Sequence, residues 1–233
     1  MNIKLLFTFL IGIAALQLCQ AHALWIETSA EGKINQKHTV KVFYGEYAQQ
    51  QIEPIDEWYS DVKDFDLYLI SPNGEKTKLE KKAKGDHFIS EFLPTTNGTY
   101  AISVIHAAKE AYQSMRFEFS SLALVNIGEN RTLPKELPFH IETASHSRIL
   151  NSTMELQVFH ENKALPETEV AVMGPDGWSK SLKTDANGKI YFKPFIRGKY
   201  IIEASQIIDK VENWSGQNIE KTWQGTTYTI III

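Results

Sequence analysis

Polar and apolar residues alternate along most of the chain with a period of two, which is the pattern of half-buried β-strands. β-Branched and aromatic residues are frequent in these runs, and clusters of Gly, Pro, Asn and Asp separate them. The alternating runs are 40–44, 66–70, 100–104, 116–119, 154–159 and 169–172, and the apolar run 229–233 predicts one more strand. The sequence therefore predicts an all-β protein.

Two segments depart from this alternation. Residues 106–114 (HAAKEAYQS) are the best helical candidate, with room for one or two turns. Residues 53–64 (EPIDEWYSDVKD) predict an acidic loop that contains another short turn.

The chain repeats itself, and the repeat predicts its domains. Residues 67–74 match residues 170–177 at an offset of 103, and each segment contains a Pro-Asn-Gly or Pro-Asp-Gly turn. Four later positions match at an offset of 100: Phe92, Pro94, Gly98 and Tyr100 against Phe192, Pro194, Gly198 and Tyr200. We therefore expect two tandem antiparallel β-sandwiches of immunoglobulin or transthyretin type, 22–135 and 136–233, joined within the polar segment 126–138.

The first 21 residues predict a secretory signal peptide. Lys4 precedes the apolar run 5–18, and small residues lead to a cleavage site after Ala21. The run is shorter than the ~20 residues that span a bilayer, and no later run reaches that length. Cleavage after Ala23 and lipidation at Cys19 are the alternatives. We expect a periplasmic or secreted protein with no transmembrane span after cleavage.

Charge and cysteine content exclude several classes of protein. The formal net charge is −4, and no block of Lys and Arg offers the basic face that a nucleic-acid partner requires. The single Cys excludes a disulfide framework and the zinc or iron–sulfur sites that need several thiolates. Any metal chemistry must therefore use nitrogen and oxygen ligands.

The motifs of the common enzyme classes are absent from the sequence. The sequence has no G-x-S-x-G, P-loop, G-x-G-x-x-G or H-E-x-x-H pattern. It has seven histidines, and no two are spaced i,i+2 or i,i+4. A metal site would therefore have to be assembled across strands.

His22 is the strongest candidate ligand. Cleavage after Ala21 would make it the first residue, with a free α-amino group beside its own imidazole. With a pKa of ~7.7–8.0 that amine is partly deprotonated at neutral pH. The two nitrogens would chelate a late first-row ion such as Cu(II) or Ni(II), and a neighbouring strand would supply a further ligand. Both alternative N-termini would remove this chelate.

Glu46 and His106 are the candidate co-ligands. Glu46 follows Val40, Val42 and Tyr44 on the apolar face of a predicted strand, where a carboxylate needs a cation or water. His106 ends the run 100–106 in the same way. The alternative for both is a solvated strand end.

Residues 150–205 resemble the carboxypeptidase-regulatory or transthyretin-like module. The resemblance implies a fold and no activity. It is carried by the segments Lys163-Ala164-Leu165-Pro166, Glu169-Val170-Ala171-Val172, Thr184-Asp185-Ala186-Asn187-Gly188-Lys189 and Gly198-Lys199-Tyr200.

The mature chain as a whole resembles a bacterial periplasmic family of unknown function that is associated with nickel/cobalt uptake. The carrying segments are 21–27 (AHALWIE), 42–46 (VFYGE), 98–100 (GTY), 124–128 (LVNIG) and 137–142 (LPFHIE). The resemblance implies a secreted metal-binding or metal-uptake accessory protein that is not an enzyme. We expect this protein to capture or relay nickel, cobalt or copper near a metal transporter in the envelope. Glu46 departs from the family pattern, which often has a second His there.

Three hypotheses about function follow. The first is a metal-binding accessory protein that uses His22. The second is a structural or adhesion β-sandwich of the envelope that binds no metal. The third is a copper oxidase or monooxygenase that uses the same amino-terminal chelate.

Overall fold

The computed structural model describes residues 22–128, 137–143 and 149–232, and strands dominate it throughout. The all-β prediction is confirmed. The predicted signal peptide with Cys19, and residues 129–136 of the predicted linker, lie outside the described residues. The strands are β1 (Ala23–Thr28), β2 (Glu31–Gly32), β3 (His38–Glu46), β4 (Gln51–Ile52), β5 (Asp66–Ile70), β6 (Lys76–Leu79), β7 (Lys82–Lys84), β8 (His87–Phe92), β9 (Gly98–Ala107), β10 (Met115–Ile127), β11 (Phe139–Thr143), β12 (Met154–His160), β13 (Lys163–Ala164), β14 (Glu169–Met173), β15 (Ser179–Lys183), β16 (Lys189–Phe192), β17 (Gly198–Trp214) and β18 (Gln217–Ile232).

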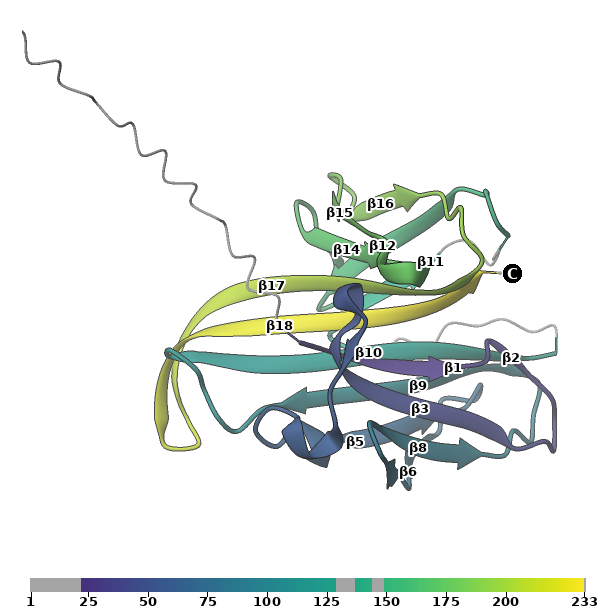
Figure 1. Cartoon of the computed structure of the whole chain (residues 1–233), viewed down its shortest axis with the longest axis horizontal. Coiled ribbons are helices and arrows are strands. Elements are labelled where there is room, and N and C mark those ends of the chain that lie inside the picture. Colours follow the sequence, from purple (N-terminus) through teal and green to yellow (C-terminus); the bar gives the residue numbers. More distant parts are fainter. Residues whose placement is uncertain (1–21, 129–136, 144–148, 233) are drawn as a thin grey trace, which may run out of the picture.

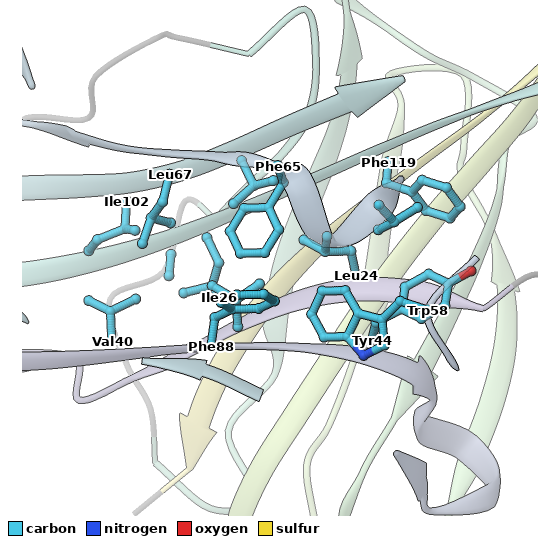
Figure 2. Close-up of a cluster of buried hydrophobic side chains, with 14 of the residues drawn as sticks. Leu24, Ile26, Val40, Tyr44, Trp58, Phe65, Leu67, Phe88, Ile102 and Phe119 are labelled. Atoms are coloured by element: carbon cyan, nitrogen blue, oxygen red, sulfur yellow. The ribbon is translucent and has the colours of Figure 1, made fainter. Parts of the chain in front are cut away.

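The N-terminal half is a sandwich with an aromatic core. One sheet has the order β1-β3-β8-β7, with β4 paired to the end of β3, and it faces the strands β5, β9 and β10. Alternate residues of β1 and β3, such as Leu24, Ile26 and Val40, point into the space between the sheets (Figure 2). There they pack against Trp58 and Phe65. Every second residue of these strands therefore lies on one buried face, as the alternation in the sequence predicts.

The C-terminal half repeats this plan. Strands β11, β12, β13 and β16 form one sheet and face β14, β17 and β18 across a second core. This core contains Leu156, Val172, Tyr200 and Tyr228. The two cores share strands, because Leu122 of β10 packs in the second core and Trp223 of β18 packs in the first.

A parallel pair of strands joins the two halves. β10 pairs with β18 from Met115 opposite Lys221 to Leu122 opposite Tyr228. This pairing makes one continuous sheet with the order β15-β14-β17-β18-β10-β9-β5-β6 through the middle of the molecule (Figure 1). Phe119 of β10 belongs to the first core whereas Leu122 belongs to the second, so the two smaller sheets cover opposite faces of the shared sheet. The parallel pair is a difference from the antiparallel arrangement that we expected throughout.

The prolines of the two Pro-x-Gly turns, Pro72 and Pro175, pack in the same way in the two halves. In the first half Pro72 lies under Gly98, where an added Cβ would be 2.5 Å from the proline Cβ. In the second half Pro175 lies under Gly198, where an added Cβ would be 2.9 Å from the proline Cγ. Both glycines have positive φ, +134° and +131°. The repeat seen in the sequence therefore corresponds to the same β-hairpin and the same crossing strand in both halves.

The helix that we expected over 106–114 is wrong. β9 continues through His106 to Ala107, and the rest forms a turn into β10 that the bridge between Tyr112 and Met115 closes. A segment this short does not stabilise a helix without a packed face, and strand pairing with β10 competes for its backbone.

The acidic loop does contain short turns, the 3-10 helices η2 (Ile55–Glu57) and η3 (Val62–Asp64), and the C-terminal run is a strand as predicted. Within the described ranges, no helix has the length and apolar character needed to cross a membrane.

The close packing of proline on glycine predicts a specific loss of stability. We expect Gly98→Ala to lower the free energy of unfolding by about 1–3 kcal/mol more than Gly74→Ala does. Both glycines have positive φ, but an added Cβ at Gly74 meets nothing within 4 Å. Urea denaturation of the two variants separates the steric cost from the backbone cost, and equal losses would contradict the packing argument.

Candidate metal centre

The strand register brings the start of β1 to the end of β3. Ala23 is opposite Gly45 in this antiparallel pair, so the next step of the register sets His22 beside Glu46. On the other side of β3, Glu46 is opposite Gln51 of β4. His22, which sequence alone places at a chain end, thus lies at one edge of a sheet among residues from two other strands.

The imidazole of His22 is held by Glu53 and Tyr44. Its Nε2 lies 2.9 Å from Glu53 Oε1, and its ring stacks on Tyr44 with 5.3 Å between the ring centres. Gln51 Nε2 donates to the same Glu53 oxygen at 2.6 Å. The hydrogen bond with His22 lowers the pKa of Glu53 below its usual value. The His22 side chain is 38% exposed, so a ligand can reach it from solvent.

Glu46 is a buried acid with an unsatisfied oxygen. The residue is 8% exposed, and its Oε2 has no hydrogen-bond partner. Burial raises the pKa of Glu46, although the nearby His22 acts in the opposite direction. A buried carboxylate oxygen without a partner is costly unless a cation or a proton compensates it.

Glu203 adds a carboxylate from the C-terminal half. It lies in β17 opposite Thr227 and is partly buried. Burial, and then the charge of Glu46, raise the pKa of Glu203 to about 8. Two acids from different halves therefore lie close enough to oppose each other's ionisation.

We call His22, Glu46, Glu53 and Glu203 the His22 cluster. It combines an imidazole with three carboxylates, which are donors that Ni(II), Co(II) and Cu(II) accept. Nowhere in residues 22–128, 137–143 and 149–232 do three or more His, Cys, Asp or Glu side chains converge on one point that could hold a metal ion. An ion would have to draw these donors together.

His106 is engaged elsewhere. Its Nε2 lies 3.2 Å from Asp61 Oδ1, and the backbone N–H of Lys109 donates to the same oxygen at 2.9 Å. Burial opposes ionisation of Asp61, but the hydrogen bonds from Lys109 and His106 outweigh it and lower its pKa to about 2. In the described part of the chain no contact joins His106 to His22 or Glu46. The structure brings two of the three predicted ligands together and places the third in a separate ion pair.

Sequence reasoning missed Glu53 and Glu203. Glu53 belonged to the predicted acidic loop, but nothing in its neighbours pointed to His22, which is 31 positions earlier. Glu203 lies in a long strand beside apolar residues, and only the packing of β17 on the N-terminal half brings it to the His22 cluster. No local pattern could have found it.

The hydrogen bonds that Asp61 accepts from His106 and Lys109 predict an acid-dependent loss of stability. The low pKa of Asp61 in the folded state means that its charged form stabilises the fold above the usual pKa of 3.8, and this contribution disappears as the pH falls through 2. We expect Asp61→Asn to cost about 2 kcal/mol at pH 6, with the difference from the natural protein shrinking between pH 4 and pH 2. Urea denaturation across this range measures it, and a constant difference would contradict the assignment.

Comparisons with known proteins give weak structural likenesses and one family. The chain matches a DUF4785 family protein from Legionella pneumophila at 13% identity and a TM-score of 0.32, covering 86% of this chain and 54% of that one, so it spans about half of that protein. It matches a segment of two fibronectin type-III domains from chicken tenascin at 11% identity and a TM-score of 0.26, covering 88% of this chain and 97% of that segment. No curated protein matches.

A family model settles the classification of the chain. It is described as a domain of unknown function, and it matches residues 19–208. The matched range includes every member of the His22 cluster and most of both sandwiches. The chain therefore belongs to the family of unknown function DUF4198.

Proposed function

We propose that the mature protein binds a divalent transition-metal ion, nickel, cobalt or copper, through the amino group and imidazole of His22. Glu46 and Glu53 supply oxygen ligands. The protein is exported, and it captures the ion outside the cytoplasm for a metal transporter of the envelope. It acts as a binding protein and not as an enzyme.

The observation that carries this proposal is the unsatisfied oxygen of Glu46 beside His22. This buried carboxylate oxygen has no partner, and such a group is costly unless a cation or a proton compensates it. A divalent cation would compensate it directly, and the neighbouring imidazole is a ligand such cations prefer. Glu53 already contacts His22 Nε2, so an ion that displaces this hydrogen bond finds a carboxylate within reach.

Cleavage after Ala21 would complete the donor set. The α-amino group would then lie at the start of β1, whose register fixes it near Glu46. An amine and an imidazole on one residue form a chelate. The entropy lost in ordering that one residue then supports two bonds to the ion. The resemblance to a family associated with nickel/cobalt uptake supports the choice of metals and the accessory role.

The role of the free amino group gives the main test. Exported protein whose intact mass confirms His22 as its first residue is compared with protein that carries one additional alanine before His22. We expect the extension to weaken Ni(II) or Cu(II) binding by more than about 100-fold. That is a larger loss than is typical when a residue that only orients a ligand is removed. Competition titration with a chromophoric chelator measures the affinity.

His106→Gln is the matched control, because it removes a histidine held by Asp61 outside the His22 cluster. Its affinity should equal that of the natural protein. Equal affinities for the mature and extended proteins would overturn the proposal, and so would an exported protein that begins at Leu24 or carries lipid on Cys19. Those results would favour the structural role without metal.

A further inference from the structure

We infer that the loop between β16 and β17 docks the protein on a membrane surface that carries anionic lipid headgroups. Residues 193–197 (KPFIR) form this loop, where β16 ends and β17 begins (Figure 1). We call it the basic loop, because it places Phe195 between Lys193 and Arg197. The inference goes beyond the proposed function and does not depend on metal binding.

The internal repeat shows that the fold does not require the side chains of the basic loop. Its counterpart in the N-terminal half is the loop 93–97 (LPTTN), which joins β8 to β9. The backbone N–H of Thr96 donates to Tyr100 Oη at 3.2 Å. In the same way, the backbone N–H of Ile196 donates to Tyr200 Oη at 3.3 Å. Because the counterpart keeps this structure with no cation and no aromatic residue, the Lys, Phe and Arg of the basic loop serve another purpose.

The aromatic side chain of the basic loop stands out from the surface. Phe195 is 50% exposed, and its ring packs edge-to-face on Trp178 with 5.2 Å between the ring centres and an angle of 87°. This arrangement offers a narrow apolar ridge and not a flat surface for stacking. Aromatic side chains that are packed at one end and exposed at the other favour the boundary between lipid and water.

The two cations of the basic loop are free to meet an external anion. The lysines that flank the loop are paired, Lys189 with Glu155 and Lys199 with Glu27. The two cations within the loop are exposed, and in the part of the chain that the structure describes neither forms an ion pair with a carboxylate. The whole protein carries a formal net charge of −4, so the loop is a positive patch on an anionic protein. Its electrostatic complement is an anionic surface.

A membrane fits the basic loop better than a protein partner does. A stable protein interface buries about 800 Å² on each partner, and one loop around a single exposed aromatic side chain is too small to form the core of such an interface. Membrane attachment adds two weaker contributions, insertion of an apolar side chain at the headgroup level and attraction of each nearby Lys or Arg to anionic lipid. The basic loop supplies both, and the predicted export signal would bring the protein to such a surface.

Sedimentation with lipid vesicles tests the inference on metal-free exported protein. We expect binding to vesicles of equal parts phosphatidylcholine and phosphatidylglycerol, and much weaker binding to phosphatidylcholine alone. Replacing Lys193 and Arg197 together by Gln should weaken binding to the mixed vesicles about 20-fold, since each basic residue near an anionic surface contributes about fivefold. Phe195→Ala should weaken it about tenfold through the lost apolar contact.

Two matched controls separate the basic loop from general stickiness and general charge. Leu93→Ala removes an equally exposed apolar side chain, 51%, from the counterpart loop. Replacing Lys82 and Lys84 together by Gln removes two exposed cations from β7. Both should bind the mixed vesicles as the natural protein does.

Three results would overturn the inference. They are natural protein that does not bind the mixed vesicles, full binding by the variant that lacks both cations of the basic loop, and binding to polyglutamate in place of vesicles, which would indicate an acidic protein partner. A failure to bind Ni(II) would refute the proposed function and leave this inference standing.

Discussion

The hydrogen bonds that hold β1 against the shared sheet are the constraint on which the rest of the structure depends. Ser121 Oγ accepts from the backbone N–H of Ile26, and Thr227 Oγ1 donates to the carbonyl of Leu24. Thr227 Oγ1 and Ser121 Oγ are themselves 2.8 Å apart, so the contacts form one buried network. In a dry interior such a network is strong and specific because an unmade bond leaves a costly polar group. β1, the first strand of the described residues, is thereby fixed in register.

The same network ties the proposed metal site to the joint between the halves. Ser121 belongs to β10 and Thr227 to β18, the two strands whose parallel pairing makes one sheet of the two sandwiches. β1 crosses over both of them, with Trp25 packed against Ile201 of the C-terminal half. β1 is therefore held by residues of both halves.

The sequence predicted what depends on local pattern and failed where distant segments meet. Alternation predicted the strands, and the repeated Pro-x-Gly turns predicted two related halves, because both signals lie within a few neighbouring residues. The parallel pairing of β10 with β18 left no such signal, since it joins segments about a hundred residues apart. At the site, the alternation from Val40 to Glu46 placed Glu46 correctly on the buried face. His106 looked equivalent by the same reasoning, but its partner Asp61 is set by the fold of a loop.

The electron paramagnetic resonance spectrum of the Cu(II)-loaded mature protein tests the account most directly. In protein labelled with ¹⁵N at histidine alone, the account predicts coupling of the copper to two labelled nitrogens, the amino and imidazole nitrogens of His22, and to no others. His22→Ala should lose both couplings. Coupling to nitrogens of other histidines, or to an imidazole without the amino nitrogen, would contradict a metal centre built on the first residue of the mature chain.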